Sequence, residues 1–204
     1  MIRNIVLDMG NVLLDYDPYL PCLRHCVKEE TANYLCDVIF RNPRWGLMID
    51  GGVMDELQYL TDVQQKLPTA ELKTLAARIM SDWWMDALYP KSGMRAFLEK
   101  LLEKGYKLYI LSNCGHRFHT FEYRIPHLEA FSGILISAEE KLLKPDVAIF
   151  NLLCERYGLK AEECLFVDDL QKNVEGAIKA GMHGHCLADG DLVRLAAHLQ
   201  QLEG

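Results

Sequence analysis

The sequence predicts an α/β protein in which helices cover both faces of a parallel β-sheet and a small all-helical insert follows the first strand. Short apolar runs recur along the chain, and helix-like stretches separate the later ones. Several runs are continuously apolar rather than alternating, as expected of strands that are buried on both faces. A long segment without a strand pattern comes after the first run and predicts the insert.

Five of the apolar runs are expected to form the sheet. In chain order they are Asn4–Asp8, Lys107–Ser112, Gly133–Ser137, Cys164–Asp168 and His183–Leu187. Helices are predicted by periodicity and by stop signals. In Ser92–Lys104 the apolar residues share one face, and a glycine follows. Pro145–Tyr157 begins with proline and ends before a glycine, and Asn173–Ala180 also ends at a glycine.

The segment from about Tyr16 to Leu88 shows helical periodicity but no convincing strand. Two apolar stripes at helical spacing are Leu57, Leu60, Val63 and Leu67, and then Leu72, Leu75, Ala76 and Ile79. We therefore expect a core made of residues 1–15 and 88–204. A helical cap of residues 16–87 is expected to lie over the edge of the sheet.

Composition limits the possible partners. The 204 residues are 50% hydrophobic and 25% charged, and 22 Lys and Arg against 29 Asp and Glu give a net charge of -7. This balance argues against general binding to nucleic acid or to a membrane surface, both of which need basic patches. No apolar run is long enough to cross a bilayer, and the N-terminus has no signal-peptide pattern. We expect a cytoplasmic monomer or weak homodimer that binds a small molecule.

The seven cysteines do not form a recognisable metal or disulfide pattern. Their number is odd, and no two are separated by two residues. Cys22 and Cys26 have the spacing of one helical turn, but no second Cys or His pair completes a zinc site. We expect buried, reduced thiols.

Asp8 is the most informative residue. It ends the first apolar run and precedes Gly10 and Asn11, which are turn residues. Asp168 and Asp169 end a later apolar run in the same way. If the two strands are neighbours, three carboxylates meet at one sheet edge, and a divalent cation or a raised pKa must relieve their repulsion. A lone strand-end aspartate is usually a turn or a cap, but two such ends favour chemistry.

These acids suit phosphoryl transfer. An aspartate can attack phosphorus and form an acyl phosphate, which water then hydrolyses. Mg²⁺ neutralises the phosphate and prefers carboxylates, a backbone oxygen and water as ligands. Asp8, the Gly10 carbonyl and Asp169 or Asp168 would provide such a set.

Polar residues after two other strands complete the candidate site. Ser112 and Asn113 follow a strand, where a hydroxyl and backbone N–H groups can hold a phosphoryl oxygen. Lys144 precedes the proline-started helix and can neutralise Asp8 and the phosphate, although Lys141 is close enough to compete. Asn173 is expected to be a structural hydrogen-bonding group.

The ordered set of motifs resembles the haloacid dehalogenase-like hydrolase superfamily. The matching segments are Val6–Val12, Leu111–Asn113, Lys144–Pro145 and Phe166–Asp169 with Asn173–Ala177. The resemblance implies a Rossmann-like sheet of order 5-4-1-2-3, with Asp8 at the topological switch point.

The resemblance also assigns roles. It implies that Asp8 is nucleophile and metal ligand, and that Gly10 offers its main-chain oxygen to Mg²⁺. It further implies that Ser112 and Asn113 bind phosphate, that Lys144 balances charge, and that Asp169 with Asp168 holds the metal directly or through water.

The chain departs from the family pattern at Gly10. Phosphatases of this superfamily usually carry there an aspartate that protonates the leaving group and then activates water. A bacterial branch that includes α-D-glucose-1-phosphate phosphatases has Asp-Leu-Gly-Asn at this place, and Asp8–Asn11 resembles it. Asp15, a cap residue or a metal-bound water are the candidates to replace the missing acid.

Substrate choice is expected to lie with the cap and with residues after the phosphate-binding strand. Trp45, Met48, Asp50 and Gly51 fall in a segment expected to be loop-like. Together with His116, Arg117 and His119 they are candidates to contact sugar hydroxyls or a second anion, although packing is the commoner use of such residues.

The leading hypothesis is a Mg²⁺-dependent phosphomonoesterase that acts on a small, sugar-like phosphorylated metabolite. A metal-independent dehalogenase, in which Asp8 attacks carbon, is weaker because Gly10 lacks the aromatic side chain expected there. A non-catalytic binding protein on the same scaffold is the third hypothesis, and the acid missing at Gly10 is its main support.

Overall fold

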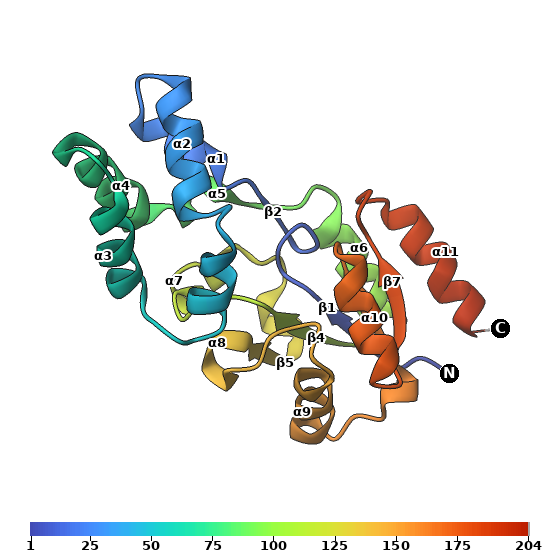
Figure 1. Cartoon of the computed structure of the whole chain (residues 1–204). Helices are drawn as coiled ribbons and strands as arrows, with labels where there is room; N and C mark the ends of the chain where they lie inside the picture. The colour runs from blue at the N-terminus through green and yellow to red at the C-terminus, as the bar shows by residue number, and fades with distance from the viewer. Residues whose placement is uncertain (204) are drawn as a thin grey trace.

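The computed structural model describes residues 1–203 and contains a five-stranded parallel sheet (Figure 1). From one edge to the other its strands are β5 (Phe131–Ile136), β4 (Lys107–Ser112), β1 (Asn4–Leu7), β6 (Cys164–Asp168) and β7 (His183–Cys186). Numbered by their order within this sheet alone, they read 3-2-1-4-5, which is 5-4-1-2-3 from the opposite edge. The expected α/β fold class is therefore confirmed.

The central strand β1 is paired on both sides. Ile5 lies opposite Leu108 of β4 and opposite Leu165 of β6. All five strands begin and end within two residues of the expected ranges, and the largest difference is at β5, which begins at Phe131 instead of Gly133. Since all five strands are parallel, the residues that follow β1, β4, β5 and β6 gather at one edge of the sheet.

Helices bury both faces of the sheet, because side chains alternate along each strand. On one face, Ile5 and Leu7 pack with residues of α6 (Met94–Glu103) and α11 (Leu192–Glu203). On the other, Val6 packs with residues of α9 (Val147–Tyr157) and α10 (Gln171–Lys179). The short helices of the core are α7 (Phe118–Phe121), α8 (Ser137–Glu140), η2 (Glu122–Arg124), η3 (Leu128–Ala130) and η4 (Ala161–Glu163).

Two short strands connect the core to residues 17–87. Sequence analysis did not predict them. β2 (Leu14–Tyr16) and β3 (Leu88–Pro90) form an antiparallel pair. Each has only three residues, too few for a period-two pattern to stand out. The expected helix at Pro145 also begins later, at Val147, where the Asp146 side chain accepts the Ala148 N–H as a cap.

Residues 17–87, here called the helical insert, lie between β2 and β3. Their elements are α1 (Tyr19–His25), α2 (Glu29–Ile39), the π-helix η1 (Trp45–Asp50), α3 (Glu56–Lys66), α4 (Ala70–Asp82) and α5 (Trp84–Ala87). The expectation of a loop-like segment around Trp45 is wrong, because this segment is η1. Figure 1 shows α1 to α4 standing to one side of the sheet, with η1 between them and α8.

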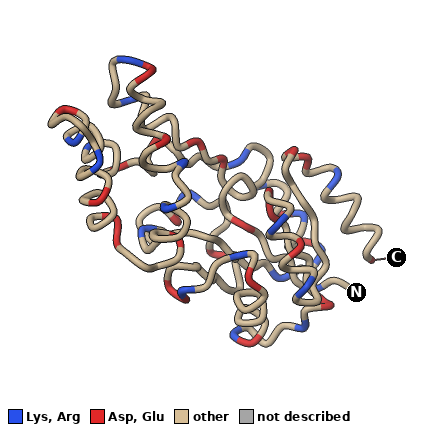
Figure 2. Tube along the Cα trace, in the orientation of Figure 1, with Lys and Arg blue, Asp and Glu red and all other residues tan. Residues whose placement is uncertain are grey.

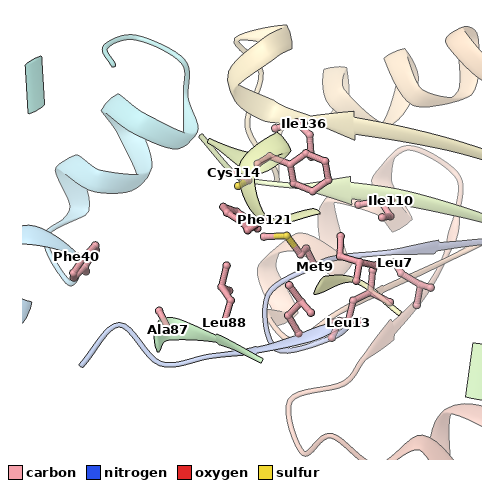
Figure 3. Close-up of a cluster of buried hydrophobic side chains, with 14 of the residues drawn as sticks. Leu7, Met9, Leu13, Phe40, Ala87, Leu88, Ile110, Cys114, Phe121 and Ile136 are labelled. Carbon is pink, nitrogen blue, oxygen red and sulfur yellow. The ribbon is translucent and has the colours of Figure 1, made fainter. Parts of the chain in front are cut away.

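A continuous hydrophobic cluster joins the helical insert to the core. Phe40, Trp45 and Trp83 of the insert contact one another edge to face or at a tilt, and Trp83 also contacts Phe121 of the core. The cluster continues to Leu7 of β1. Figure 3 shows Phe40, Leu88, Phe121 and Leu7 in this order across the boundary between insert and core. Trp45 is therefore a packing residue.

The end of η1 is fitted closely against the carboxyl-end edge of the sheet. A Cβ atom on Gly52, whose φ is +64°, would lie 2.1 Å from the carbonyl oxygen of Ala138. A Cβ atom on Gly115 would lie 2.6 Å from the Ile49 side chain. The Ser137 hydroxyl donates to the Asp50 carbonyl oxygen at 2.5 Å. These contacts seat the insert at one position over the edge.

Charge is spread over the surface without separation into halves. Figure 2 shows Lys and Arg interspersed with Asp and Glu along most of the trace.

None of the helices in residues 1–203 has both the length and the apolar content that crossing a bilayer requires. All seven cysteines are free thiols; five are buried, while Cys154 and Cys186 are partly exposed.

We predict that Gly52→Ala destabilises the protein more than Gly158→Ala does. Both glycines have φ near +60°, so both substitutions carry a similar backbone cost of about 1 kcal/mol. A Cβ atom at Gly158 meets nothing within 4 Å, whereas one at Gly52 meets the Ala138 backbone. Urea unfolding should show a further loss of about 1–3 kcal/mol for Gly52→Ala. Equal losses would contradict the close seating of the insert.

Candidate active site

Asp8 lies at the middle of the carboxyl-end edge, directly after β1. Its backbone N–H donates to the Val167 carbonyl at 2.9 Å, which continues the pairing of β1 with β6. The chain then turns away at Asn11, whose φ of +55° is a conformation that asparagine tolerates. The Asp8 side chain is almost fully buried, with the residue only 8% exposed. Its carboxylate therefore needs a partner.

Lys144 is that partner. Its Nζ lies 2.8 Å from Asp8 Oδ1 and 2.7 Å from Asp168 Oδ2, and it donates to the Leu111 carbonyl at 3.0 Å. The residue is 3% exposed. One buried ammonium thus joins the ends of β1, β4 and β6. Lys141, the competing candidate, is exposed and takes no part in this group.

Asn113 holds the backbone of Lys144. Its Nδ2 donates to the Lys144 carbonyl at 3.0 Å, and its Oδ1 accepts the Lys144 N–H at 2.8 Å. Both polar atoms of the side chain are therefore used within the protein. Ser112, the other residue expected to bind phosphate, is buried at the end of β4.

Asp168 is held by three groups of the protein. Besides Lys144, its carboxylate accepts the Leu170 N–H at 2.9 Å and the Asn173 Nδ2 at 3.0 and 3.1 Å. The residue is fully buried. Asn173 is thus placed as a structural hydrogen-bonding group. Both oxygens of Asp168 have partners, so this carboxylate is suited to positioning Lys144 more than to binding a ligand.

Asp169 completes a group of three carboxylates. One oxygen each from Asp8, Asp168 and Asp169 lie within 4.8 Å of one another, close enough for a single cation to contact them. Asp169 is half-buried, and one of its oxygens accepts the Asn11 Nδ2 at 2.9 Å. Asn11 is a residue that sequence analysis did not single out for this contact. Hard oxygen donors at this spacing fit Mg²⁺.

The electrostatics of the group favour a cation. Burial raises the pKa of Asp8 to about 6, an increase that Lys144 opposes and the charge of Asp168 reinforces. Burial also raises the pKa of Asp169, against the hydrogen bond from Asn11. Burial would lower the pKa of Lys144, but Asp8 and Asp168 together hold it above the usual value. The lysine therefore stays charged, and the acids have more negative charge than it neutralises.

Gly10, the position at which related phosphatases usually carry an acid, has free space around it. A Cβ atom on Gly10 would meet nothing within 4 Å, and its φ is not positive. Asp15, one candidate replacement, is exposed and pairs with Lys91 at 2.8 Å on the β2–β3 pair. Asp15 is thus committed elsewhere.

Other candidates for substrate contact differ in their surroundings. Arg117 pairs with Glu56 at 2.8 Å and donates to the Ser81 carbonyl at 3.1 Å, so it ties the helical insert to the core. His119 lies between Glu122 and Glu139 on the surface.

A cavity of about 300 Å³ is lined by Ile49, Met54, Asp55, Glu56, His116, Arg117 and Thr120. A larger one, about 610 Å³, lies at the opposite edge of the sheet around Asn4 and Lys107, away from Asp8.

Comparison with known proteins places the chain among hydrolases. The model of the haloacid dehalogenase-like hydrolase family matches residues 2–181. A sesquiterpene phosphatase from Aspergillus oryzae is 27% identical over 206 residues, covering 99% of this chain and 97% of the relative. A phosphorylated carbohydrates phosphatase from Thermotoga maritima is 25% identical over 202 residues, covering 93% and 88%.

Solved structures share the fold. A haloacid dehalogenase-family enzyme from Bacteroides thetaiotaomicron, a mutant in complex with magnesium and inorganic phosphate, superposes with a TM-score of 0.71 at 20% identity. The match covers 91% of this chain and 94% of that chain.

We predict that Lys144→Met is strongly destabilising and that its cost increases with pH. Removing one partner of a buried ion pair leaves an uncompensated charge, which costs about 3–5 kcal/mol. Because the pKa of Asp8 is already raised to about 6, the carboxyl takes up a proton near pH 5 and the penalty shrinks there. Urea unfolding at pH 5 and pH 8 measures both values.

Lys141→Met is the matched control, since Lys141 is exposed. Its effect should stay within about 0.5 kcal/mol at either pH. A Lys144→Met variant that resembles this control, or that is equally destabilised at both pH values, would contradict the ion-pair geometry.

Proposed function

Since the chain belongs to the haloacid dehalogenase-like hydrolase family, we propose that it is a Mg²⁺-dependent phosphomonoesterase that acts through an aspartyl phosphate on Asp8. Its substrate would be a small phosphorylated metabolite, with sugar phosphates as the favoured class. The observation that carries the proposal is the single buried ammonium of Lys144, 2.8 Å from Asp8 and 2.7 Å from Asp168, beside a third carboxylate.

Asp8, Asp169 and the Gly10 carbonyl would hold Mg²⁺. Asp169 keeps one oxygen that does not receive the Asn11 hydrogen bond, whereas Asp168 uses both of its oxygens within the protein. We therefore assign the direct contact to Asp169, with Asp168 acting through position or through water. The ion would neutralise the phosphate dianion, so that a carboxylate can approach it.

The residues of the chain would then divide the work. The second oxygen of Asp8 attacks phosphorus and becomes phosphorylated. Lys144, fixed by Asn113, neutralises charge on Asp8 and on the phosphoryl group. The Ser112 hydroxyl at the end of β4 binds a phosphoryl oxygen. These groups are placed by the sheet edge before substrate arrives, so little reorganisation is needed.

The helical insert would act as the cap and set the substrate. Together with Tyr16 it makes up the proposed cap of residues 16–87, and residues 1–15 and 88–204 make up the proposed core. The Thermotoga relative is named for phosphorylated carbohydrates and the Aspergillus relative for a sesquiterpene phosphate. The cavity of about 300 Å³ between the helical insert and the core is lined by polar side chains, including Glu56, His116 and Arg117, which favour a hydroxyl-rich ester over an apolar one. We assign the activity to the cytoplasm, where such metabolites occur.

We predict that hydrolysis of an aryl phosphate requires both Mg²⁺ and Asp8. Wild-type protein should release phosphate with Mg²⁺, lose that activity with a chelator and regain it when Mg²⁺ is restored. Asp8→Asn should lower the rate by more than about 10³-fold, because the nucleophile is lost. Halide release from a 2-haloacid without metal would favour the dehalogenase, and absence of turnover on a panel of sugar and prenyl phosphates would refute the proposal.

We also predict that Mg²⁺ stabilises the wild-type protein against heat, since a ligand that binds only the folded state raises its stability. At a concentration 100 times the dissociation constant the gain is about 2.7 kcal/mol. Asp169→Asn should remove most of the shift. Asp37→Asn, on an exposed residue paired with Arg41, should keep it. Equal shifts in both variants would place the cation elsewhere.

A further inference from the structure

The site lacks an obvious proton donor for the leaving group. Gly10 occupies the position where many family phosphatases carry the acid, and Asp15 is tied to Lys91 on the surface. Expulsion of an alkoxide from a phosphate ester is slow unless a proton reaches the departing oxygen. With Gly10 and Asp15 set aside, a residue of the helical insert is the remaining side-chain candidate to protonate the leaving group of a sugar or alkyl phosphate.

Asp50 lies over the same edge of the sheet as Asp8, at the end of η1. Its neighbours on both sides touch the core at residues next to the site. Ile49 contacts Gly115, two residues after Asn113, and Gly51 lies against Leu143, which precedes Lys144. The Asp50 carbonyl oxygen accepts the Ser137 hydroxyl at 2.5 Å, and that hydroxyl accepts the Cys114 N–H at 2.9 Å. Figure 1 shows η1 beside α8, which begins at Ser137.

The Asp50 carboxyl is half-buried, and no group within residues 1–203 forms an ion pair or hydrogen bond with it. Glu56, a half-buried acid of the insert, is by contrast paired with Arg117 at 2.8 Å. Burial and the negative charges of Asp8 and Glu56 hold the pKa of Asp50 well above its usual range, against the charge of Lys144. A carboxyl in such surroundings holds its proton more tightly than an exposed aspartate does, which suits it to proton transfer.

We propose that Asp50, delivered by the helical insert, is the general acid and base of the reaction and takes the part that Gly10 cannot take. The assignment rests on the proposed phosphatase function. It makes the insert a carrier of a catalytic residue as well as a determinant of the substrate.

The steps balance as follows. As Asp8 forms its bond to phosphorus, the bond from phosphorus to the ester oxygen breaks, and that oxygen takes the proton of the Asp50 carboxyl and leaves as an alcohol. Asp50 is then a carboxylate. It removes a proton from water while the water oxygen attacks phosphorus, which breaks the bond to Asp8. The products are an alcohol and inorganic phosphate, and both aspartates return to their starting states.

The free space at Gly10 and the close contact of η1 with the core are both consistent with Asp50 acting in place of a side chain at Gly10. Because a Cβ atom on Gly10 would meet nothing within 4 Å, no side chain of the described core fills the space where that atom would lie. Gly52 and Gly115 let η1 approach the core so closely that Asp50 is held by backbone contacts rather than by side-chain contacts of its own carboxyl. The carboxyl is thereby positioned yet free to exchange a proton.

The experiment measures Asp50→Asn with a series of phosphate esters whose leaving groups differ in basicity, each at saturating Mg²⁺. Loss of a general acid should lower kcat/KM by about 10²–10⁴-fold for alkyl and sugar esters. Esters with a very acidic leaving group, such as dinitrophenyl phosphate, need no proton and should lose much less in the phosphorylation step. With them the phosphorylated enzyme should accumulate, because the base for the second step is missing. Asp15→Asn is the matched control and should behave as wild type.

A uniform loss across the series would assign Asp50 to binding or structure and overturn the proposal, as would a rate equal to wild type. Gly10→Asp in the Asp50→Asn background should restore part of the rate on alkyl esters, since a side chain fits at Gly10. Asp50→Ala, checked by thermal unfolding, serves as the second variant if the Asn variant does not fold.

If wild-type protein hydrolyses no ester, the proposed phosphatase function is wrong. If wild type and Asp15→Asn are active and only the dependence on the leaving group is absent, the assignment of Asp50 alone is wrong.

Discussion

The contact of one buried ammonium with two buried carboxylates is the constraint on which the rest of this structure depends. Lys144 joins Asp8 to Asp168 at the middle of the sheet edge. Either acid alone would be costly to bury without its charge neutralised, and the lysine would be equally costly without them. Because the three acids outnumber the lysine, the edge retains negative charge that a divalent cation can neutralise. The same ion pairs among Lys144, Asp8 and Asp168 thus stabilise the fold and position the candidate site.

The fold brings this group together from distant parts of the chain. Parallel pairing places the ends of β1 and β6 side by side although they are far apart in sequence. Asn113, after β4, then holds the backbone of Lys144 through two hydrogen bonds. The helical insert covers the same edge and is seated by glycines that allow backbone to approach backbone. These parts of the chain therefore each contribute one component of the candidate site: the Asp8 carboxylate, the buried Lys144 ammonium and a cover.

Much of this could be predicted from sequence, and the exceptions have physical causes. The strands of the sheet are apolar runs buried on both faces, so they stand out clearly in the sequence. Asp8 and Lys144 can be predicted as site residues because each follows such a strand. The role of Asn113 could not be predicted, because an amide after a strand is equally suited to phosphate and to backbone. The π-helix around Trp45 has no distinctive periodicity, so the sequence favours a loop there and does not place Asp50 over the sheet edge. The β2–β3 pair cannot be predicted, because strands of three residues show no alternation.

The central claim is that the Asp8 carboxylate is the group that accepts the phosphoryl group. The most direct test is to mix the protein with Mg²⁺ and a fast-reacting aryl phosphate, quench with acid within the first turnover, and map the phosphorylated peptide by mass spectrometry. We expect an acid-stable, base-labile acyl phosphate on Asp8. A phosphoryl group on another residue, or product formation with no phosphorylated protein at any time, would contradict it.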